Sequence, residues 1–189
     1  MNPELKAEFE NYYVKPLTVA EVTPQYLEWL NDKEVNEYLE LKYVKYDLPM
    51  LLDYVKSFEN DNSRFAFGIF DKETNKHIGN GSIYNVNRHV GTFDIGYLIG
   101  DKSYWGKNSG FATVLMLCKI AFEDLKMRKI FTYIYSTNVR SRFVMQKIGF
   151  VNEATLKDRV LFEGKPTDSC VYALNVDQWN NSVKNKYKI

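Results

Sequence analysis

FDIGYLIGDKSYWGKNSGFATVLMLCKIAFEDLK, residues 93–126, places a strand pattern, a glycine-rich junction and a helix pattern directly after one another. Apolar side chains alternate from Phe93 to Ile99, which is typical of a strand with one buried face. The segment after Gly110 carries an apolar stripe at helical spacing: Val114, Leu115, Cys118, Ala121, Phe122 and Leu125. A strand that enters a helix through glycines forms either a simple turn or a site for a phosphate group.

Two well-known phosphate motifs do not fit this junction. In the P-loop template four residues separate the glycines, whereas five separate Gly100 from Gly106, and Asn108 replaces the hydroxyl residue that would hold Mg²⁺. The dinucleotide fingerprint needs a third glycine and a following helix, but Gly79 and Gly81 lead only to Tyr84. Both motifs are therefore set aside.

A third interpretation needs no metal. Backbone N–H groups of a tight loop at a helix N-terminus can surround a diphosphate, and the positive end of the helix supports it. Gly106, Ser109 and Gly110 are small enough, Asn108 tolerates a left-handed backbone, and Lys107 adds a cation. The alternative is an ordinary helix start, because Gly, Ser and Asn are common loop residues.

Composition indicates one ordinary globular domain over residues 1–189, with residues 1–12 loosely ordered. The formal net charge of +1 and the lack of a basic run give no indication of a nucleic-acid partner. Neither a signal peptide nor a membrane-spanning run is evident, so we expect a cytoplasmic chain without a membrane partner. Two cysteines without a CxxC pair and two histidines give no disulfide framework and no metal site.

Hydrophobic patterning predicts an α/β (α+β) fold, in which a mixed sheet of about seven strands carries helices on both faces. The strands are expected at 13–22, 64–70, 77–86, 93–99, 129–136, 150–162 and 169–176. The helices are expected at 23–40 with a break near Asn31, at 48–60, after Gly110, and at 138–148 before Gly149. Strand 129–136 is apolar or aromatic on both faces, which favours a central position in the sheet.

Two motifs in this order resemble the GCN5-related N-acetyltransferases (GNAT), an acetyl-CoA-dependent family. The segment Trp105–Gly110 resembles the family pattern [QR]-x-x-G-x-[GA], with Asn108 in place of a glycine; 107–112 is the alternative register. The second pattern, N-x-x-S-x-x-x-x-x-K-x-G-F, matches Asn138, Ser141, Lys147, Gly149 and Phe150. The resemblance spans roughly residues 12–180 and is strongest to the branch of ribosomal-protein, polyamine and amino-sugar acetyltransferases.

The resemblance implies that strands 93–99 and 129–135 are parallel and splay apart around the pantetheine arm of acetyl-CoA, the cosubstrate. It implies no metal. It implies that the residues around acetyl-CoA are Tyr97, Leu98, Ile99, Trp105, Gly106, Lys107, Asn108, Ser109, Gly110, Phe111, Asn138 and Met145. Backbone groups of residues 97–99 would pair with the arm, and one N–H would stabilise the oxyanion.

Catalysis in such a site needs a base for the ammonium of the acceptor and an acid for the leaving thiolate. Asp94 is the candidate base, with an ordinary exposed carboxylate as the alternative. Ser141 is the candidate thiol partner, and a local backbone hydrogen bond is the alternative role. Relatives place a Tyr acid where this chain has Met145, so Tyr84, Tyr97 and Tyr172 are possible substitutes.

For the acceptor site, the expected residues are Trp29, Tyr38, His77 and Tyr84, with a structural role as the alternative for His77. Overall similarity favours a nucleotide-linked amino sugar as the small-molecule amine. A protein N-terminus, a polyamine or an aminoglycoside remains an alternative, as does a non-catalytic CoA-binding module. Glu34, Glu37 and Glu40 are expected on a solvated helix face, and a homodimer is expected from the family.

Overall fold

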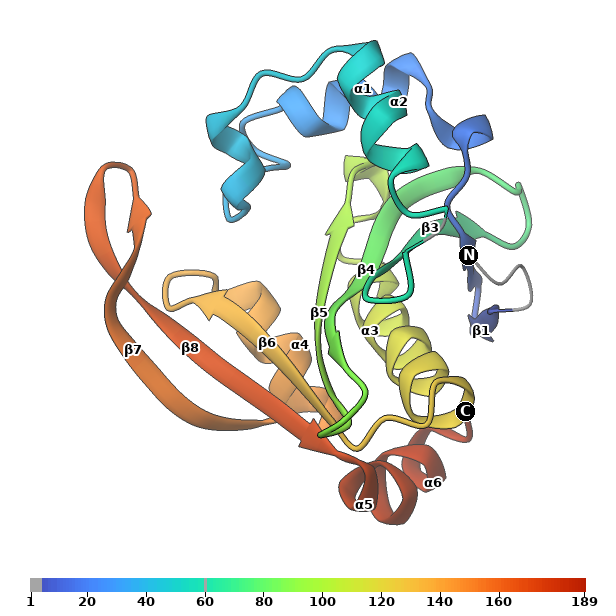
Figure 1. Cartoon of the computed structure of the whole chain (residues 1–189), viewed down its shortest axis with the longest axis vertical. Coiled ribbons are helices and arrows are strands. Elements are labelled where there is room, and N and C mark those ends of the chain that lie inside the picture. Colours follow the sequence, from blue (N-terminus) through green and yellow to red (C-terminus); the bar gives the residue numbers. More distant parts are fainter. Residues whose placement is uncertain (1–4, 60) are drawn as a thin grey trace.

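The protein is described by a computed structural model that covers residues 5–59 and 61–189. One open sheet of eight strands has the order β1-β2-β3-β4-β5-β6-β8-β7 (Figure 1). The strands are β1 Ala7–Phe9, β2 Tyr12–Pro16, β3 Phe65–Asp71, β4 His77–Asn87, β5 Thr92–Ile99, β6 Lys129–Tyr135, β7 Val151–Phe162 and β8 Lys165–Asn175. Neighbouring strands are antiparallel except for β5 and β6, which are parallel. The predicted α/β class with a mixed sheet is thus confirmed.

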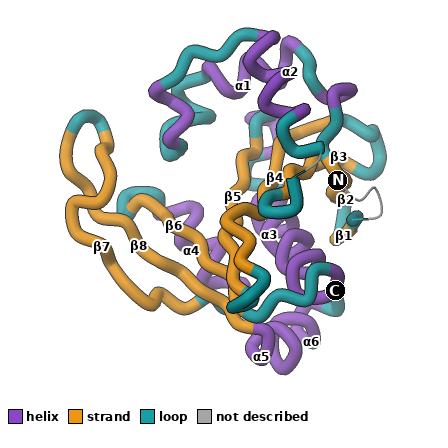
Figure 2. The backbone as a smooth tube through the Cα atoms, viewed as in Figure 1, coloured by secondary structure: helices purple, strands orange, loops and turns teal. Residues whose placement is uncertain are grey.

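The helices frame this sheet, and Figure 2 shows α1 and α2 at one end of the molecule and α5 and α6 at the opposite end. Their bounds are α1 Pro24–Asn31, α2 Leu48–Lys56, α3 Ser109–Lys119, α4 Val139–Ile148, α5 Val176–Gln178 and α6 Lys184–Tyr187. Thr23 caps α1 as predicted, because its hydroxyl accepts a hydrogen bond from the Tyr26 amide. Gly149, with φ 121°, follows the end of α4 as predicted.

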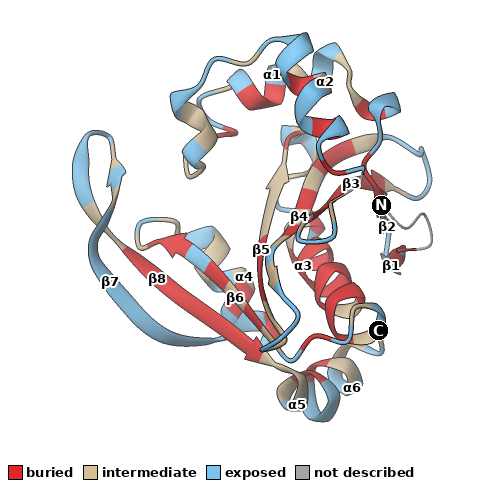
Figure 3. Cartoon of the chain, in the orientation of Figure 1, coloured by how far each residue is buried: buried red, intermediate tan, exposed pale blue. Residues whose placement is uncertain are grey.

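Two hydrophobic cores lie on opposite faces of the sheet, because side chains alternate along each strand. Phe65 and Phe67 pack into the core that includes α3, whereas Ala66 between them packs into the core of α1 and α2. Figure 3 shows α3 as almost entirely buried. Helices therefore cover both faces, as predicted. No helix in the described part of the chain is long and apolar enough to cross a membrane.

The parallel pair β5–β6 separates soon after it begins. Its ladder contains three residue pairs, Thr92–Lys129, Phe93–Ile130 and Asp94–Phe131. Both strands then continue, to Ile99 and Tyr135, without further pairing between them. Figure 1 shows them moving apart. The splayed pair is therefore present, and we call the sheet face that carries Asp94, opposite α3, the front face.

The N-terminal part differs from the sequence prediction. Residues 1–4 lie outside the described range, but Ala7–Phe9 forms β1 and pairs with β2, so the segment expected to be loosely ordered adds an eighth strand. The strand expected at 13–22 ends at Pro16, because Thr18 and Glu21 form a capping box that starts a 3₁₀ turn.

Other element ends also shift. Helix α1 ends at Asn31, near the expected break, and does not resume as an α-helix by residue 40. Helix α2 ends at Lys56; the predicted end at residue 60 lies outside the described residues. Strand β8 begins at Lys165, earlier than predicted, because Glu163 and Gly164 complete a two-residue turn with φ of 51° and 74°.

The glycine at position 79 is required by the close approach of two strands. A Cβ atom there would lie 2.2 Å from the Leu98 carbonyl oxygen, which belongs to the backbone of β5. A Cβ at Gly96, on the same strand pair, would meet only side chains of Ser82 and Tyr84 at 3.5 Å.

We expect Gly79→Ala to cost about 2–3 kcal/mol of unfolding free energy through overpacking. For a chain of this size, that is a fall in Tm on the order of 5–10 °C. Gly96→Ala is the matched control and leaves Tm unchanged or slightly raised. Thermal unfolding followed by circular dichroism measures both variants; equal Tm values would contradict the close approach.

Candidate functional site

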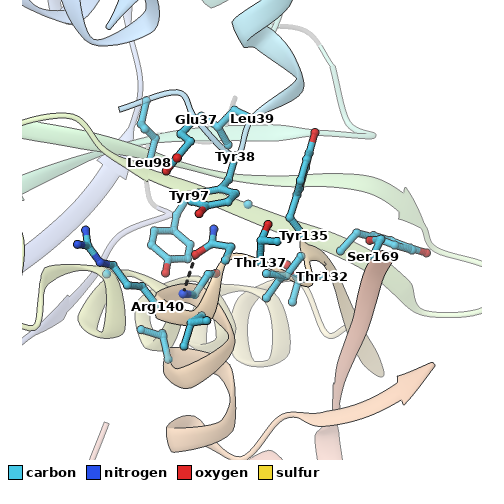
Figure 4. A pocket seen from close by; sticks show the side chains of 18 of the residues that line it. Glu37, Tyr38, Leu39, Tyr97, Leu98, Thr132, Tyr135, Thr137, Arg140 and Ser169 are labelled. Atoms are coloured by element: carbon cyan, nitrogen blue, oxygen red, sulfur yellow. Dashed lines mark hydrogen bonds between the residues drawn. The ribbon is translucent and has the colours of Figure 1, made fainter. Parts of the chain in front are cut away.

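The front face of the splayed strands forms the floor of a large open cleft with a volume of about 2160 Å³. Its walls come from segment 34–43, the β7–β8 hairpin and the N-terminal ends of α3 and α4. Figure 4 shows side chains from these elements converging, among them Tyr38, Tyr97, Tyr135 and Arg140. The volume exceeds that of a usual small-ligand pocket, so it can hold two reactants together.

The loop before α3 is shaped by two residues with left-handed backbones, Gly106 at φ 76° and Asn108 at φ 67°. The first free backbone N–H groups of α3 belong to Ser109, Gly110 and Phe111, which have no acceptor within the described residues, whereas Ala112 donates to the Asn108 carbonyl. These N–H groups and the positive end of the helix create a place for an anionic group at the end of the cleft.

Tyr97 and Trp105 hold this loop against the end of β5. A Cβ on Gly110 would lie 2.9 Å from the Tyr97 ring, so the ring can pack there only over a glycine. The Trp105 indole donates a 2.8 Å hydrogen bond to the Ile99 carbonyl. The Ile99 carbonyl therefore already accepts one hydrogen bond from within the chain. Tyr97 and Leu98 remain on the unpaired edge of β5.

Asp94 lies on the cleft floor, where only 8% of it is exposed. The Asn85 amide donates a 2.7 Å hydrogen bond to its carboxylate. Asn85 reaches it from a bulge: β4 inserts one extra residue between the Tyr84–Asp94 and Asn87–Thr92 pairs, and Asn85 has φ 52°. Burial raises the pKa of Asp94, and the hydrogen bond from Asn85 acts in the opposite direction. The exposed-carboxylate alternative is thus excluded.

Two tyrosines that line the cleft, Tyr84 and Tyr97, remain protonated at neutral pH. Burial, supported by the charge of Asp94, raises the pKa of Tyr84 to about 12. Burial also raises the pKa of Tyr97, while a side-chain hydrogen bond with Ser141 lowers it. Ser141 follows the N-cap of α4, where the Asn138 side chain accepts a 3.1 Å hydrogen bond from the Ser141 amide. The cleft therefore contains a buried carboxyl group, that of Asp94, and the neighbouring side chains of Tyr97 and Ser141.

Most predicted site residues line this cleft. They are Tyr38, Tyr84, Asp94, Tyr97, Leu98, Ile99, Trp105, Gly106, Asn108, Ser109, Gly110, Phe111, Asn138 and Ser141. Their chemical roles stay predictions.

Five other predicted residues do not line the cleft: Met145, Lys107, Tyr172, Trp29 and His77. Met145 is 1% exposed and packs into the core behind α4, because its position on the helix faces the sheet. The Lys107 ammonium lies over the Tyr104 ring and its carbonyl accepts from Tyr12, away from the cleft. Tyr172 is buried in the core and accepts hydrogen bonds from Arg142 and Gln146.

Trp29 belongs to the core of α1 and α2, and the His77 ring packs against it. A Cβ on Gly100 would overlap the Trp29 ring, which shows how closely Trp29 packs on the end of β5. His77 contacts Trp29 edge-on and stacks on Phe70, and its Nε2 lies 2.8 Å from the Gly79 carbonyl. Burial lowers the pKa of His77. Neither residue lines the cleft, and the structural alternative for His77 is correct.

Several cleft residues were not expected from the sequence. On the front face of β6, Tyr133 is 51% exposed and Tyr135 lines the cleft, although aromatic residues on both sides had suggested two buried faces. Strand β6 is interior to the sheet, as predicted, but its front side faces the cleft. Arg140 and the hairpin residue Leu161 also line it, as do Glu34, Glu37 and Glu40, which do not lie on a solvated α-helix.

Comparison with known proteins decides the family. The model of the acetyltransferase (GNAT) domain matches residues 13–151. The chain belongs to the GNAT acetyltransferase family. Members of this family use acetyl-CoA as cosubstrate.

Individual relatives agree with this assignment. The ribosomal protein uS5 alanine N-acetyltransferase of Escherichia coli is 29% identical over 131 residues, which is 68% of this chain and 66% of that protein, just under two thirds of its length. The N-acetyltransferase p20 of Bacillus licheniformis is 27% identical, covering 87% of this chain and 96% of that protein. The structure of a Vibrio cholerae spermidine N-acetyltransferase with CoA and spermine has a TM-score of 0.82 at 16% identity, covering 90% of this chain and 99% of that chain. That likeness concerns the fold.

The GNAT cosubstrate fits the residues of this cleft. The unpaired N–H groups at the start of α3 suit its diphosphate, and the unpaired edge of β5 suits the amides of its pantetheine arm. When bound, acetyl-CoA supplies an activated acetyl thioester. Among the described residues, no group of His, Cys, Asp and Glu is arranged to hold a metal ion.

Asn108 offers a sharp test of the diphosphate position. We expect Asn108→Asp to weaken CoA binding by about 10–100-fold, because a carboxylate would lie beside the diphosphate. Aspartate tolerates the left-handed backbone and suits a helix N-terminus, but it loses the 3.2 Å hydrogen bond from the Asn108 amide to the exposed Glu10 carboxylate, so Tm should fall only slightly. Asn108→Gly is the control and retains binding. Isothermal titration calorimetry with CoA measures the affinity of each variant. A titration with pantetheine, which lacks the diphosphate, should show no difference in affinity between Asn108→Asp and the wild type.

Proposed function

We propose that this chain transfers the acetyl group of acetyl-CoA to an aliphatic primary amine, with Asp94 as base. The observation that carries the proposal is the separation of β5 and β6 directly after Asp94. The separation leaves a groove that begins at the free N–H groups of α3 and ends beside the buried carboxylate of Asp94 on the cleft floor.

Binding and orientation supply the first part of the rate. The loop at Gly106 to Phe111 fixes one end of the donor, and the unpaired edge of β5 aligns its arm along the strand. The acceptor approaches over the front face, between Tyr84 and Tyr133. Holding the amine nitrogen in line with the thioester carbonyl converts a bimolecular reaction into an effectively unimolecular one.

Asp94 is proposed to take the proton from the acceptor ammonium, directly or through a water molecule. Its raised pKa makes it a better base than an exposed carboxylate, and Asn85 fixes the orientation of the carboxylate. The nitrogen then forms a bond to the carbonyl carbon. As the tetrahedral intermediate collapses, the carbon–sulfur bond breaks and the nitrogen releases its second proton to water, which balances the proton that the leaving sulfur receives. The neighbouring Tyr84 phenol keeps its proton and lies on the same face.

The leaving sulfur is proposed to receive its proton from Ser141, which is replenished by Tyr97. Met145 cannot donate a proton and is buried, so the usual position of the family's acid is not used. The closeness of Ser141 to the Tyr97 phenol supports this role, because Ser141 lowers the pKa of Tyr97 and both side chains line the cleft. Tyr172 is too far inside the core to contribute.

For the acceptor, the comparisons give no support to a nucleotide-linked amino sugar. The relatives named above are described as acting on a ribosomal-protein alanine and on spermidine, both of which present an aliphatic primary amine. We propose the same chemistry for this chain. The following test distinguishes a small aliphatic amine, a protein N-terminus and an aminoglycoside as acceptors.

A thiol-release assay with acetyl-CoA tests the activity over aliphatic amines, N-terminal peptides, aminoglycosides and amino-sugar nucleotides. Release of thiol that depends on the amine supports the proposal and identifies the acceptor. CoA binding without turnover on any amine favours a non-catalytic binding module. Absence of CoA binding in the folded chain contradicts both functions.

Replacement of Asp94 separates catalysis from stability. We expect Asp94→Asn to lower kcat by about 10²–10⁴-fold, with little change in CoA affinity. The raised pKa of the folded state means that ionisation costs stability above that pKa and costs none below the unfolded value. The variant should therefore be at least as stable as the wild type at neutral pH. The difference should shrink as pH falls below the folded pKa and vanish below the unfolded value.

Denaturant unfolding across pH, together with the thiol-release assay, measures both effects. Asp53→Asn, at an exposed position on α2, is the matched control and changes neither quantity. Full activity of Asp94→Asn would remove Asp94 from the mechanism.

A second kinetic test concerns the proton donor. Ser141→Ala and Tyr97→Phe should each lower kcat, because either change interrupts the same proton transfer. Since the two residues act as one unit, the double variant should be about as slow as the slower single variant. Multiplicative effects of the two changes in steady-state kinetics would show that they act independently.

A further inference from the structure

The ammonium of Lys42 lies among three aromatic rings at the rim of the cleft. Its Nζ is 5.3 Å from the centroid of the Tyr43 ring, 4.9 Å from that of Tyr135 and 5.5 Å from that of Phe162. These rings come from the 3₁₀ turn at 40–43, the end of β6 and the end of β7. We call Tyr43, Tyr135 and Phe162 the ring site.

The rings are fixed by contacts other than Lys42. The Tyr135 hydroxyl donates a 2.8 Å hydrogen bond to the Glu40 carboxylate, and Tyr43 donates a 3.0 Å hydrogen bond to the Leu161 carbonyl. Tyr38 stacks on Phe162 with a centroid distance of 5.2 Å and an interplanar angle of 4°. The ring site is therefore built by the fold and would persist without the lysine.

The contacts of Lys42 are ones that any alkylammonium group could make. Its Nζ donates a 2.8 Å hydrogen bond to the Glu37 carbonyl, and no carboxylate of a described residue forms an ion pair with it. Ring faces attract an ammonium through their quadrupoles, and sets of rings are a common means of binding organic cations. The lysine is held by weak, general contacts.

The ring site opens on the proposed catalytic cleft. Tyr43, Tyr135, Glu37 and Glu40 line the same cleft as Asp94. A cation that replaced the Lys42 ammonium would meet the same rings and the Glu37 carbonyl, with the Glu40 carboxylate next to Tyr135. The Lys42 ammonium thus occupies the ring site in the way that the ammonium group of a ligand would.

We propose that the ring site binds an alkylammonium group of a ligand and that Lys42 is its intramolecular competitor. The inference rests on the proposed function in one respect, the identification of the ligand as an acceptor. Such an acceptor carries two cationic groups: one replaces Lys42 in the ring site, and the other reaches Asp94. Lys42 then sets the affinity for the acceptor, since each ligand must displace it.

Binding titrations without an acetyl donor test this proposal. The probes are diaminobutane, butylamine and tetramethylammonium. Their binding is measured by calorimetry and by shifts of the aromatic proton signals of the tyrosines in NMR spectra. We expect Lys42→Met to bind all three about 5–30-fold more tightly than the wild type, because the competitor is gone. Lys42→Arg should behave as the wild type, since its guanidinium refills the site. Lys45→Met, at an exposed position three residues further on, is the control without effect.

A second replacement assigns any gain to the rings. Phe162→Leu in the Lys42→Met background should abolish the tighter binding. Unchanged or weaker binding by folded Lys42→Met would overturn the proposal and show Lys42 to be a structural contact; a gain that survives Phe162→Leu would also overturn it. If Lys42→Met does not fold, Lys42→Gln serves in its place.

These measurements are independent of transfer activity. The titrations contain no acetyl donor, so their outcome does not depend on catalysis. If the separate assay with acetyl-CoA showed no thiol release, that result would contradict the proposed function and leave the ring-site result standing. Conversely, an active enzyme whose Lys42→Met variant binds the probes no better would contradict the ring site alone.

Discussion

The early end of the β5–β6 ladder is the constraint on which the site depends. Parallel strands need a crossover, and here α3 provides it behind the sheet. The carboxyl ends of both strands therefore reach the same edge, and each leads into the N-terminal end of a helix, α3 or α4. Once the pairing stops at Asp94, these two helix ends, an unpaired strand edge and a carboxylate face one open space.

The separation persists because each strand is firmly held on its other side. Strand β5 pairs with β4 up to its last residue, Ile99, and the contact of Gly79 with the Leu98 carbonyl leaves no room for adjustment. Trp29 packs over Gly100, and Trp105 is bonded to Ile99, so the end of β5 is anchored to the second core. Strand β6 pairs with β8 along its whole length. Each half of the sheet is thus held by its own strand pairing, and the two halves stand apart beyond Asp94.

Periodicity in the sequence identified the order of strands and helices around the site, because it depends on local burial. The residue type at position 108 indicated that the backbone there could be left-handed, and Asn108 has a φ of 67° in the structure. Met145, Trp29 and His77 were misplaced because a motif position or an aromatic side chain does not reveal which way its element faces. The exposure of Tyr133 could not be predicted for a related reason: a strand that separates from its neighbour has the same sequence pattern as a strand that is covered on both faces.

The roles of single atoms were beyond the sequence. That Asn85 reaches Asp94 follows from a one-residue bulge, which the local residues Tyr84 to Asn87 do not signal. The ring site joins residues more than ninety positions apart in the chain, from Lys42 to Tyr135. Such contacts are set by the closing hairpin, whose course depends on the whole sheet.

The unpaired edge of β5 also means that the sheet is complete only with its ligand. A donor whose arm pairs with this strand acts as a substitute strand, so part of its binding energy becomes folding energy of the region around the cleft. Backbone amides at Leu98 and its neighbours then exchange their hydrogens at a rate set by ligand concentration rather than by the fold alone. In a cell, the supply of acetyl-CoA would thereby regulate how rigid this protein is, as well as how fast it works.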